Sequence, residues 1–402
     1  MAPFLDEARM DSEDSIAALD SRQTLRALAT AGAQVREAVD LSLEAGIDRV
    51  AGGERPRSVL VASLGGSAVV CDVLDLLAEP GSPVPVSVRR NVPLPGWVGP
   101  LDLVIAVSLS GRAAGPLALA AEAARRGASL LTVGAAHSPL AEVSAQARGV
   151  HIDSGRGRTS SRTAMWSMLA PALLGAGRLG IVDVDEQVLH ATADRLDEVA
   201  EACRPSSESF VNPAKVLAAD VAAGVPMVLG DGPLAGVAAG RAASMLARTA
   251  RMPATTGELP DDAAQVVACF DGPFTASFGG GEEGAVGAGR PVDDIFADPY
   301  LDGPPAPRLS LVVLRDAPPQ EPSTPEQAAA VGLTDAVVRG ARDAGATVSE
   351  VTAQPGAPVT RLAGLMATTD FAATYLAIGL GLDPAVSPHV ADLADRTGRG
   401  DR

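Results

Sequence analysis

A Gly-Gly-Ser segment and a Ser-x-Ser-Gly segment are the places in this chain where residue types and spacing point to chemistry. The first runs from Gly65 to Ser67, directly after the apolar residues 59–62. The second starts at Ser108, after the apolar residues 103–107. Glycine lets a backbone come close to a ligand, and the free amides of a helix that starts after such a turn attract an anion. Serine hydroxyls add donors, so the pattern predicts a binding site for a phosphate group.

Alternating strands and helices must position these turns. Short apolar segments alternate with segments that have apolar residues at helical spacing, which predicts a parallel, doubly wound sheet. In the first half we predict strands at 59–62, 84–88, 103–107, 129–133 and 149–152, and helices at 68–77, 113–126, 139–147 and 161–174. In the second half we predict helices at 212–222, 234–251, 325–344 and 361–382, and strands at 225–229, 309–314 and 346–351.

The chain therefore divides into two α/β halves, which share an architecture but no sequence repeat. We assign residues 1–183 to N-terminal helices and a first subdomain, 184–211 to a linker helix, and 212–394 to a second subdomain. Residues 271–307 are rich in Gly, Pro and Asp without periodicity, which predicts a loop. Residues 395–402 are predicted to be a polar tail.

Composition excludes several classes of protein. With 402 residues, 47% of them hydrophobic, the chain is long enough to bury a large core. Its formal net charge of −17 argues against binding to nucleic acid or to an anionic membrane. The first residues resemble no secretory signal, and no apolar segment predicts a membrane span. The cysteines Cys71, Cys203 and Cys269 form no metal or disulfide spacing, so we predict a cytoplasmic protein without metal or cofactor.

The glycine and serine turns carry a resemblance to a known family. Two α/β halves with such turns resemble the sugar isomerase (SIS) domain, and more closely the bifunctional phosphoglucose/phosphomannose isomerase family. The segment from Ser63 to Asp72 is similar to the family's G-M-G-G-S-G-x-x-G-D turn and keeps both glycines, the serine and the final aspartate. The segment from Ser108 to Ala113 keeps the serines and the glycine of its S-x-S-G-N-T turn, but not the Asn and Thr. Arg162 stands where the family has an arginine ahead of a helix.

The resemblance implies two SIS-like, flavodoxin-like subdomains of the α/β class, joined by helices, in a homodimer. It implies a hexose 6-phosphate as ligand and the aldose–ketose isomerisation of glucose 6-phosphate or mannose 6-phosphate as the reaction. The implied substrate-binding residues all lie in the first half: Gly65, Gly66, Ser67, Ser108, Ser110 and Arg162. Each also has an explanation without a ligand, since tight turns need glycine and serine caps helices, but their combination favours a binding site.

The residues that the family uses for catalysis are not matched. The family uses a glutamate as base, a histidine that follows it, and a lysine near the C-terminus. Alignment by eye puts Arg248 at the glutamate, Ala264 at the histidine and a position near Ala394 at the lysine. An arginine is a permanent cation and cannot accept the proton that isomerisation moves. Lys215, the chain's only lysine, is predicted to lie on a solvated helix face.

Two residues remain as catalytic candidates. Glu258 lies in the right region for a base, and His389 lies close to where the family's lysine belongs. Both are equally explained as exposed surface side chains. Two functions therefore stay open: an isomerase with altered catalytic groups, or a phosphosugar sensor that keeps the ligand cradle and lacks the base. The intact turns speak against a protein that uses the fold only as a scaffold.

Overall fold

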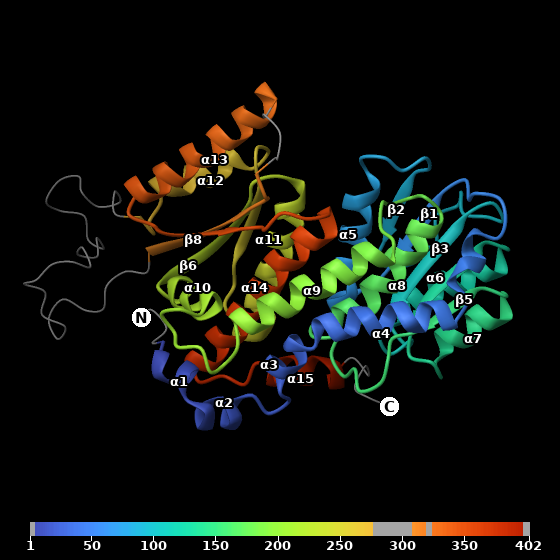
Figure 1. The fold of residues 1–402 in the computed structure, drawn as a ribbon, viewed down its shortest axis with the longest axis horizontal. Helices are drawn as coiled ribbons and strands as arrows, with labels where there is room; N and C mark the ends of the chain where they lie inside the picture. The colour runs from blue at the N-terminus through green and yellow to red at the C-terminus, as the bar shows by residue number, and fades with distance from the viewer. Residues whose placement is uncertain (1–4, 276–307, 319–323, 397–402) are drawn as a thin grey trace, which may run out of the picture. The chain divides into compact units, whose positions relative to one another are not determined.

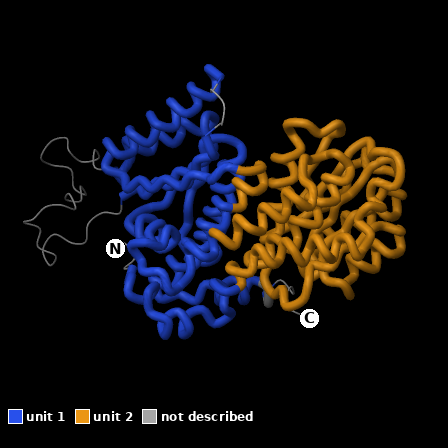
Figure 2. The backbone as a smooth tube through the Cα atoms, in the orientation of Figure 1, with its two compact units in different colours: residues 1–26, 199–355, 364–402 blue, residues 27–198, 356–363 orange. Residues whose placement is uncertain are grey.

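The computed structural model describes residues 5–275, 308–318 and 324–396. Most of the predicted loop 271–307 and of the predicted tail 395–402 therefore lies outside the described residues. The chain forms two compact units (Figure 2), each with its own parallel sheet. Unit 1 comprises residues 1–26, 199–355 and 364–402, and unit 2 comprises residues 27–198 and 356–363. The predicted α/β class with two parallel sheets is confirmed.

Unit 2 is built on a five-stranded sheet in the order β2-β1-β3-β4-β5 (Figure 1). Its strands are β1 (Val59–Ala62), β2 (Val86–Arg89), β3 (Leu103–Ser108), β4 (Ser129–Gly134) and β5 (Val150–Asp153). Every residue of β1 and β3 is buried, as expected for parallel strands that are covered on both faces. All the strands predicted in the first half are present, with bounds shifted by at most two residues.

Helices cover both faces of this sheet. On one face α4 (Ala31–Glu44), α5 (Val69–Ala78) and α8 (Met165–Arg178) pack together, and η1 (Ile47–Ala51) follows α4. On the other face α6 (Ala114–Arg125) and α7 (Pro139–Gln146) pack on a cluster of small and branched apolar side chains: Leu60, Ala62, Val104, Ala106, Leu119, Ala120, Leu130 and Leu140. α9 (Glu186–Ala202) lies along α4 and is held by ion pairs of Arg36 with Asp194 and Asp197, at 2.6 and 2.7 Å.

Unit 1 has a four-stranded sheet in the order β7-β6-β8-β9. The strands are β6 (Gly224–Gly230), β7 (Thr255–Glu258), β8 (Arg308–Arg315) and β9 (Thr347–Thr352). β7 is not among the predicted strands. Its Thr-Thr-Gly-Glu sequence is mostly exposed, and it joins the edge of the sheet through backbone pairing with β6. An edge strand of this kind leaves no apolar pattern in the sequence.

The helices of unit 1 also cover both faces of their sheet (Figure 1). α12 (Ala263–Ala268), η4 (Cys269–Asp271) and α13 (Pro325–Asp343) cover one face, and α10 (Pro213–Ala222), α11 (Pro233–Met245) and the later turns of α14 (Pro358–Gly379) cover the other. The predicted helix 234–251 is α-helical only in its first part. α11 ends at Met245, and the π-helical turn η3 (Leu246–Ala250) follows.

The N-terminal helices α1 (Glu7–Asp11) and α2 (Glu13–Leu19) belong to unit 1, and α3 (Thr24–Ala29) follows them.

The prediction for Lys215 is wrong, because its side chain is fully buried rather than solvated. Its ammonium donates to the Asp11 carboxylate at 2.8 Å and to the carbonyls of Pro205 and Ser207 at 2.8 and 2.7 Å. This contact ties α1 to α10, so residues 1–26 group with unit 1, whereas the sequence assigned them to the first subdomain.

One described helix, α14, is long and apolar enough to cross a membrane by length and composition. Its most apolar stretch is 89% buried inside the structure, which is typical of a core helix. Thr369 and Ala372 of α14 line the interior beside Val228 and Val312 of the sheet of unit 1. The last described helix is α15 (Pro388–Arg396).

Candidate functional site

The two glycine–serine turns follow β1 and β3. These neighbouring strands are the point in the sheet of unit 2 at which the strand order reverses. β2 pairs with one side of β1 and β3 with the other, in the parallel register Ala62↔Arg89 and Ala62↔Ala106. Open α/β sheets bind ligands beyond the carboxyl ends of the strands at such a switch point. The order of strands therefore brings both predicted turns to the place where a ligand is expected.

The first turn offers its backbone rather than its hydroxyl. Gly65 has a left-handed φ of 66° and open space where a Cβ would stand. Gly65 is exposed and Gly66 half-buried, whereas Ser67 is buried and its hydroxyl contacts the Met168 sulfur of α8 at 3.3 Å. The hydroxyl of Ser63 donates to the Ser67 carbonyl at 2.8 Å, which fixes the loop. A ligand at this turn would meet glycine amides.

In the second turn one serine is buried and the other is exposed to solvent. Ser108 is buried, and its hydroxyl accepts a hydrogen bond from the Ala113 amide at 3.3 Å. Ser110 is exposed, and its hydroxyl accepts from the Arg112 amide at 3.3 Å. Gly111 between them has a left-handed φ of 65°. Both hydroxyls thus hold amides at the start of α6, and Ser110 is the one that a ligand could reach.

The start of α6, which follows the second turn, packs against the first turn and against the loop after β2. A Cβ on Gly115 would lie 3.5 Å from the Leu64 side chain of the first turn and 3.0 Å from the Arg90 carbonyl after β2. Arg90 in turn pairs with Asp72 in the first turn of α5, at 2.5 Å. Burial raises the pKa of Asp72, and the Arg90 guanidinium opposes that shift. The loops after β1, β2 and β3 therefore form one packed rim.

Arg162 lies at the same rim, three residues before α8. The Arg162 side chain is half-buried, and its amide donates to the Ser160 hydroxyl at 3.3 Å. Gln34 of α4 holds the next residue by donating to the Thr163 carbonyl at 2.8 Å. Because Met168 of α8 contacts Ser67, the helix that Arg162 precedes begins beside the first turn.

Three helices begin at this rim without a side-chain cap. The N-cap residues of α5, α6 and α8 are Ala68, Ala113 and Ala164, and none of them makes a side-chain cap hydrogen bond. α7, which follows β4, is capped by the Ser138 hydroxyl. An uncapped helix start leaves first-turn amides without a side-chain acceptor, and the positive end of the helix dipole lies there. The switch point is therefore a favourable place for an anion.

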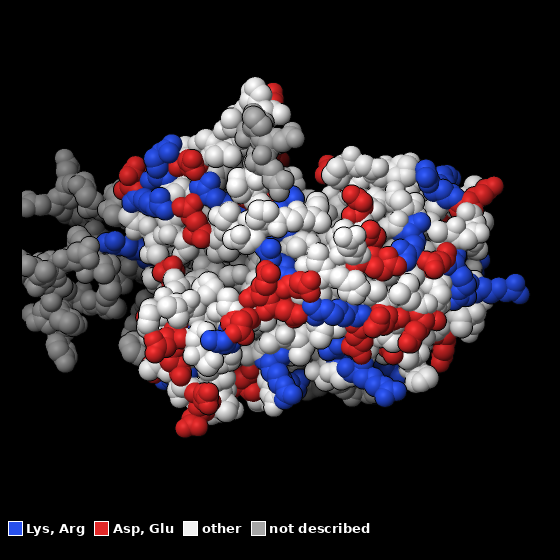
Figure 3. Space-filling view, in the orientation of Figure 1, with Lys and Arg blue, Asp and Glu red and all other residues white. Residues whose placement is uncertain are grey.

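The residues that follow the strands differ in charge between the two units. The five residues after each strand of unit 2 include four arginines and no Asp or Glu: Arg90, Arg112, Arg156 and Arg158. The corresponding residues of unit 1 include four aspartates and no Lys or Arg: Asp231, Asp261, Asp262 and Asp316. Burial raises the pKa of Asp231. Elsewhere on unit 2 both signs are mixed, as Figure 3 shows over α4 and α9. This difference in charge favours the binding of an anion at the strand ends of unit 2 over those of unit 1.

The two catalytic candidates lie in unit 1, whereas the six binding candidates lie in unit 2. Glu258 ends the edge strand β7, and its carboxylate packs against Gly236 in the first turn of α11. His389 is the second residue of α15 and is exposed. Arg248, at the place of the family's glutamate, is exposed in the π-helical turn η3.

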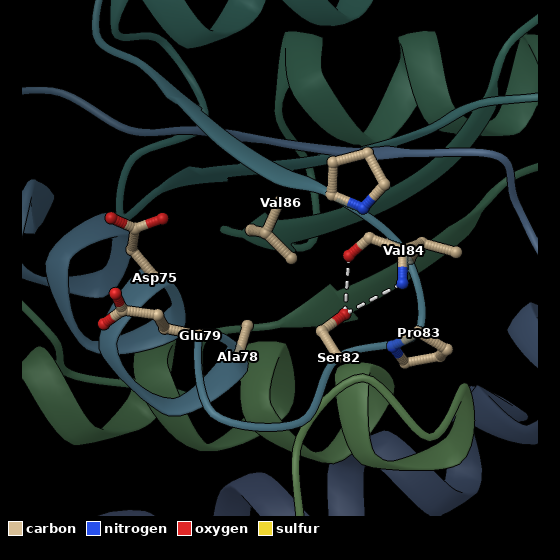
Figure 4. A pocket seen from close by; sticks show the side chains of 8 residues that line it. Asp75, Ala78, Glu79, Ser82, Pro83, Val84 and Val86 are labelled. Carbon is tan, nitrogen blue, oxygen red and sulfur yellow. Dashed lines mark hydrogen bonds between the residues drawn. The ribbon is translucent and has the colours of Figure 1, made fainter.

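A hollow of about 470 Å³ lies at the other end of the same sheet, between the end of α5 and the start of β2. Figure 4 shows Asp75 and Glu79 side by side along its wall, with Ser82 bonded to the backbone of Val84. Two carboxylates would repel a phosphate. Within the described residues no group of three or more His, Cys, Asp or Glu side chains could hold a metal ion. The switch point therefore remains the candidate site for the phosphate.

Comparison with known proteins identifies part of the chain. Residues 210–396 match the bacterial phospho-glucose isomerase C-terminal SIS domain. Somewhat less than half of the chain is therefore similar to an SIS domain. A bifunctional phosphoglucose/phosphomannose isomerase from Caldicellulosiruptor bescii is 26% identical over 196 residues, which are 49% of this chain and 57% of the relative. The chain thus spans little more than half of the curated relative that it matches.

Solved structures with a similar fold cover nearly the whole chain. A hypothetical protein from Thermus thermophilus is similar with a TM-score of 0.66 at 15% identity, over 98% of this chain and 93% of that one. The C-terminal domain of glucosamine-fructose-6-phosphate aminotransferase from Francisella tularensis gives 0.59 at 12% identity, over 90% and 97%. Tagatose-6-phosphate ketose/aldose isomerase from Escherichia coli gives 0.58 at 14% identity, over 92% and 96%. At these identities the likeness concerns the fold.

Sequence reasoning missed the arginine-rich rim. Arg112 stands in the loop that follows the predicted strand 103–107, and Arg156 stands in the loop that follows the predicted strand 149–152. Counting charges in the residues that follow each strand would have found them. The uncapped helix starts could not have been found in this way. Serines stand close to each start in the sequence, and only the structure shows which groups their hydroxyls contact.

Proposed function

We propose that this protein binds a hexose 6-phosphate, with the phosphate at the switch point between β1 and β3 of unit 2. The observation that carries the proposal is the convergence of three uncapped helix starts with the exposed turns at Gly65 and Ser110. Amides in such a position bind phosphate oxygens, and the dipoles of the helices favour negative charge.

The sugar part of the proposal rests on relatives. The curated relative is named for phosphoglucose and phosphomannose, and the matched domain for phospho-glucose. Glucose 6-phosphate and mannose 6-phosphate are therefore the first ligands to test. Arg162, at the start of α8, is proposed to face the sugar, and a homodimer in the cytoplasm is proposed as the working state.

Aldose–ketose isomerisation needs a base that moves a proton between neighbouring carbons and a group that stabilises the enediolate. Arg248 stands where the resemblance expects the base, and a guanidinium cannot fill that role. If turnover occurs, Glu258 is the proposed base and His389 the proposed second group. The replacement by Arg248 favours a second candidate function, a phosphosugar sensor with the ligand cradle and without the base.

Thermal unfolding in the presence of glucose 6-phosphate, mannose 6-phosphate and fructose 6-phosphate tests the proposal. A ligand that binds only the folded state at about 100 times its Kd stabilises that state by about 2.7 kcal/mol. For a unit of this size such a gain raises Tm by about 5–10 °C. A coupled isomerase assay on the same sample then separates the two candidates: binding with turnover supports the isomerase, and binding alone the sensor. The absence of any shift with all three sugars would contradict the proposal.

A further inference from the structure

Four arginines follow the strands of unit 2, and two of them already have acidic partners. Arg90 pairs with Asp72, and Arg158 pairs with Glu37 of α4. Arg112 and Arg156 are exposed, and in the part of the chain that the structure describes neither side chain makes an ion pair. Both guanidinium groups are therefore available to a ligand.

The two arginines stand on loops that touch each other. The Ser154 hydroxyl, after β5, donates to the Leu109 carbonyl of the second turn at 3.4 Å. The Ser154 amide donates to the Gly134 carbonyl at the end of β4 at 2.9 Å. Arg156 comes two residues after Ser154, and Arg112 comes three residues after Leu109. The fold thus brings both cations to the edge that carries the predicted cradle.

The placement of Arg112 is electrostatically unfavourable without an anion. Arg112 comes two residues before α6, at the positive end of the helix dipole, where a cation is disfavoured. Arg156 adds a second positive charge on the neighbouring loop. A bound anion offsets the cost at Arg112, because a guanidinium and helix amides can share its oxygens.

We propose that Arg112 and Arg156 bind the phosphate group of the ligand and make the site select a doubly charged phosphate ester over a singly charged ester. This inference rests on the proposed function and deepens it. The amides at Gly65 and at the start of α6 would bind either ester, since both have similar oxygens. The two guanidinium groups would respond to the second negative charge.

Calorimetric titration with glucose 6-phosphate and glucose 6-sulfate tests this selection. At about pH 8 the phosphate is a dianion, because its second pKa is about 6, whereas the sulfate is a monoanion. The proteins compared are the wild type, R112Q, R156Q, the double variant and the control R148Q. Arg148 is an exposed arginine in the turn before β5, at the end of the sheet where the strands begin, so R148Q removes the same charge away from the rim.

We expect each single substitution to weaken glucose 6-phosphate binding about tenfold, the usual loss for a charge-assisted hydrogen bond, and the double variant to bind both esters alike. R148Q should stay within about twofold of the wild type. If the wild type binds glucose 6-phosphate and the double variant binds it equally well, the inference is wrong and the proposed function stands. If the wild type binds neither ester, both are wrong.

Discussion

Replacing Lys215 by methionine should destabilise unit 1 by about 3 kcal/mol. The ammonium group makes three hydrogen bonds, to the Asp11 carboxylate and to the carbonyls of Pro205 and Ser207, and its side chain is fully buried. Methionine fills a similar volume but donates nothing. Each carbonyl that loses its donor costs about 1 kcal/mol, at the low end because both lie in a partly exposed segment. Asp11 is 40% exposed, so water takes part of its loss, and we count the ion pair at about 1 kcal/mol.

The assay is urea-induced unfolding followed by two signals. Both tryptophans, Trp97 and Trp166, lie in unit 2, so tryptophan fluorescence follows unit 2. Far-UV circular dichroism follows the helices of both units. We expect the K215M transition to shift in circular dichroism by the stated amount. D11N, which keeps an acceptor for the ammonium, should cost only about 1 kcal/mol. A loss below about 1 kcal/mol in K215M would refute the view that this contact ties α1 to α10.

The sign of a pH effect follows from the same contact. Burial raises the pKa of Asp11, but its hydrogen bonds with Lys215 and Ser209 outweigh that effect and lower the pKa. The stabilisation is therefore complete above the unfolded pKa of about 3.9 and is lost as pH falls through the lower folded value. Acid titration of stability should show this loss in the wild type below about pH 4 and not in K215M.

The remaining predictions concern the candidate site. Because the hydroxyl of Ser110 is exposed and that of Ser67 lies against α8, S110A should weaken glucose 6-phosphate binding several-fold more than S67A in calorimetric titration; equal losses would contradict this placement. Gly65→Ala and Gly111→Ala should each cost about 1 kcal/mol for a left-handed backbone, and Gly111→Ala more because its Cβ would collide with the Ser138 side chain, which urea unfolding measures. If the coupled assay detects turnover, Glu258→Gln should remove it, and full activity in that variant would exclude Glu258 as the base.

The apolar pattern was enough to predict most of the elements. The strands 59–62 and 103–107 of the first half are buried on both faces, so every residue carries the signal. The edge strand β7 escaped because its Thr-Thr-Gly-Glu sequence pairs through the backbone and buries little. The π-helical turn at Leu246–Ala250 escaped for a related reason, since it keeps the apolar spacing of the helix that it interrupts.

By itself the sequence determined the two parallel sheets and the two turns, because glycine, serine and short apolar runs specify local conformation. It could not decide what each turn residue does. Ser67 and Ser110 have the same side chain after similar strands, yet only the packing of α8 buries the hydroxyl of Ser67. The burial of Lys215 and the meeting of the loops of Arg112 and Arg156 likewise depend on contacts between residues far apart in the chain, such as Lys215 with Asp11 and Ser154 with Leu109. Local residue preferences carry no record of such contacts, and the fold alone brings them about.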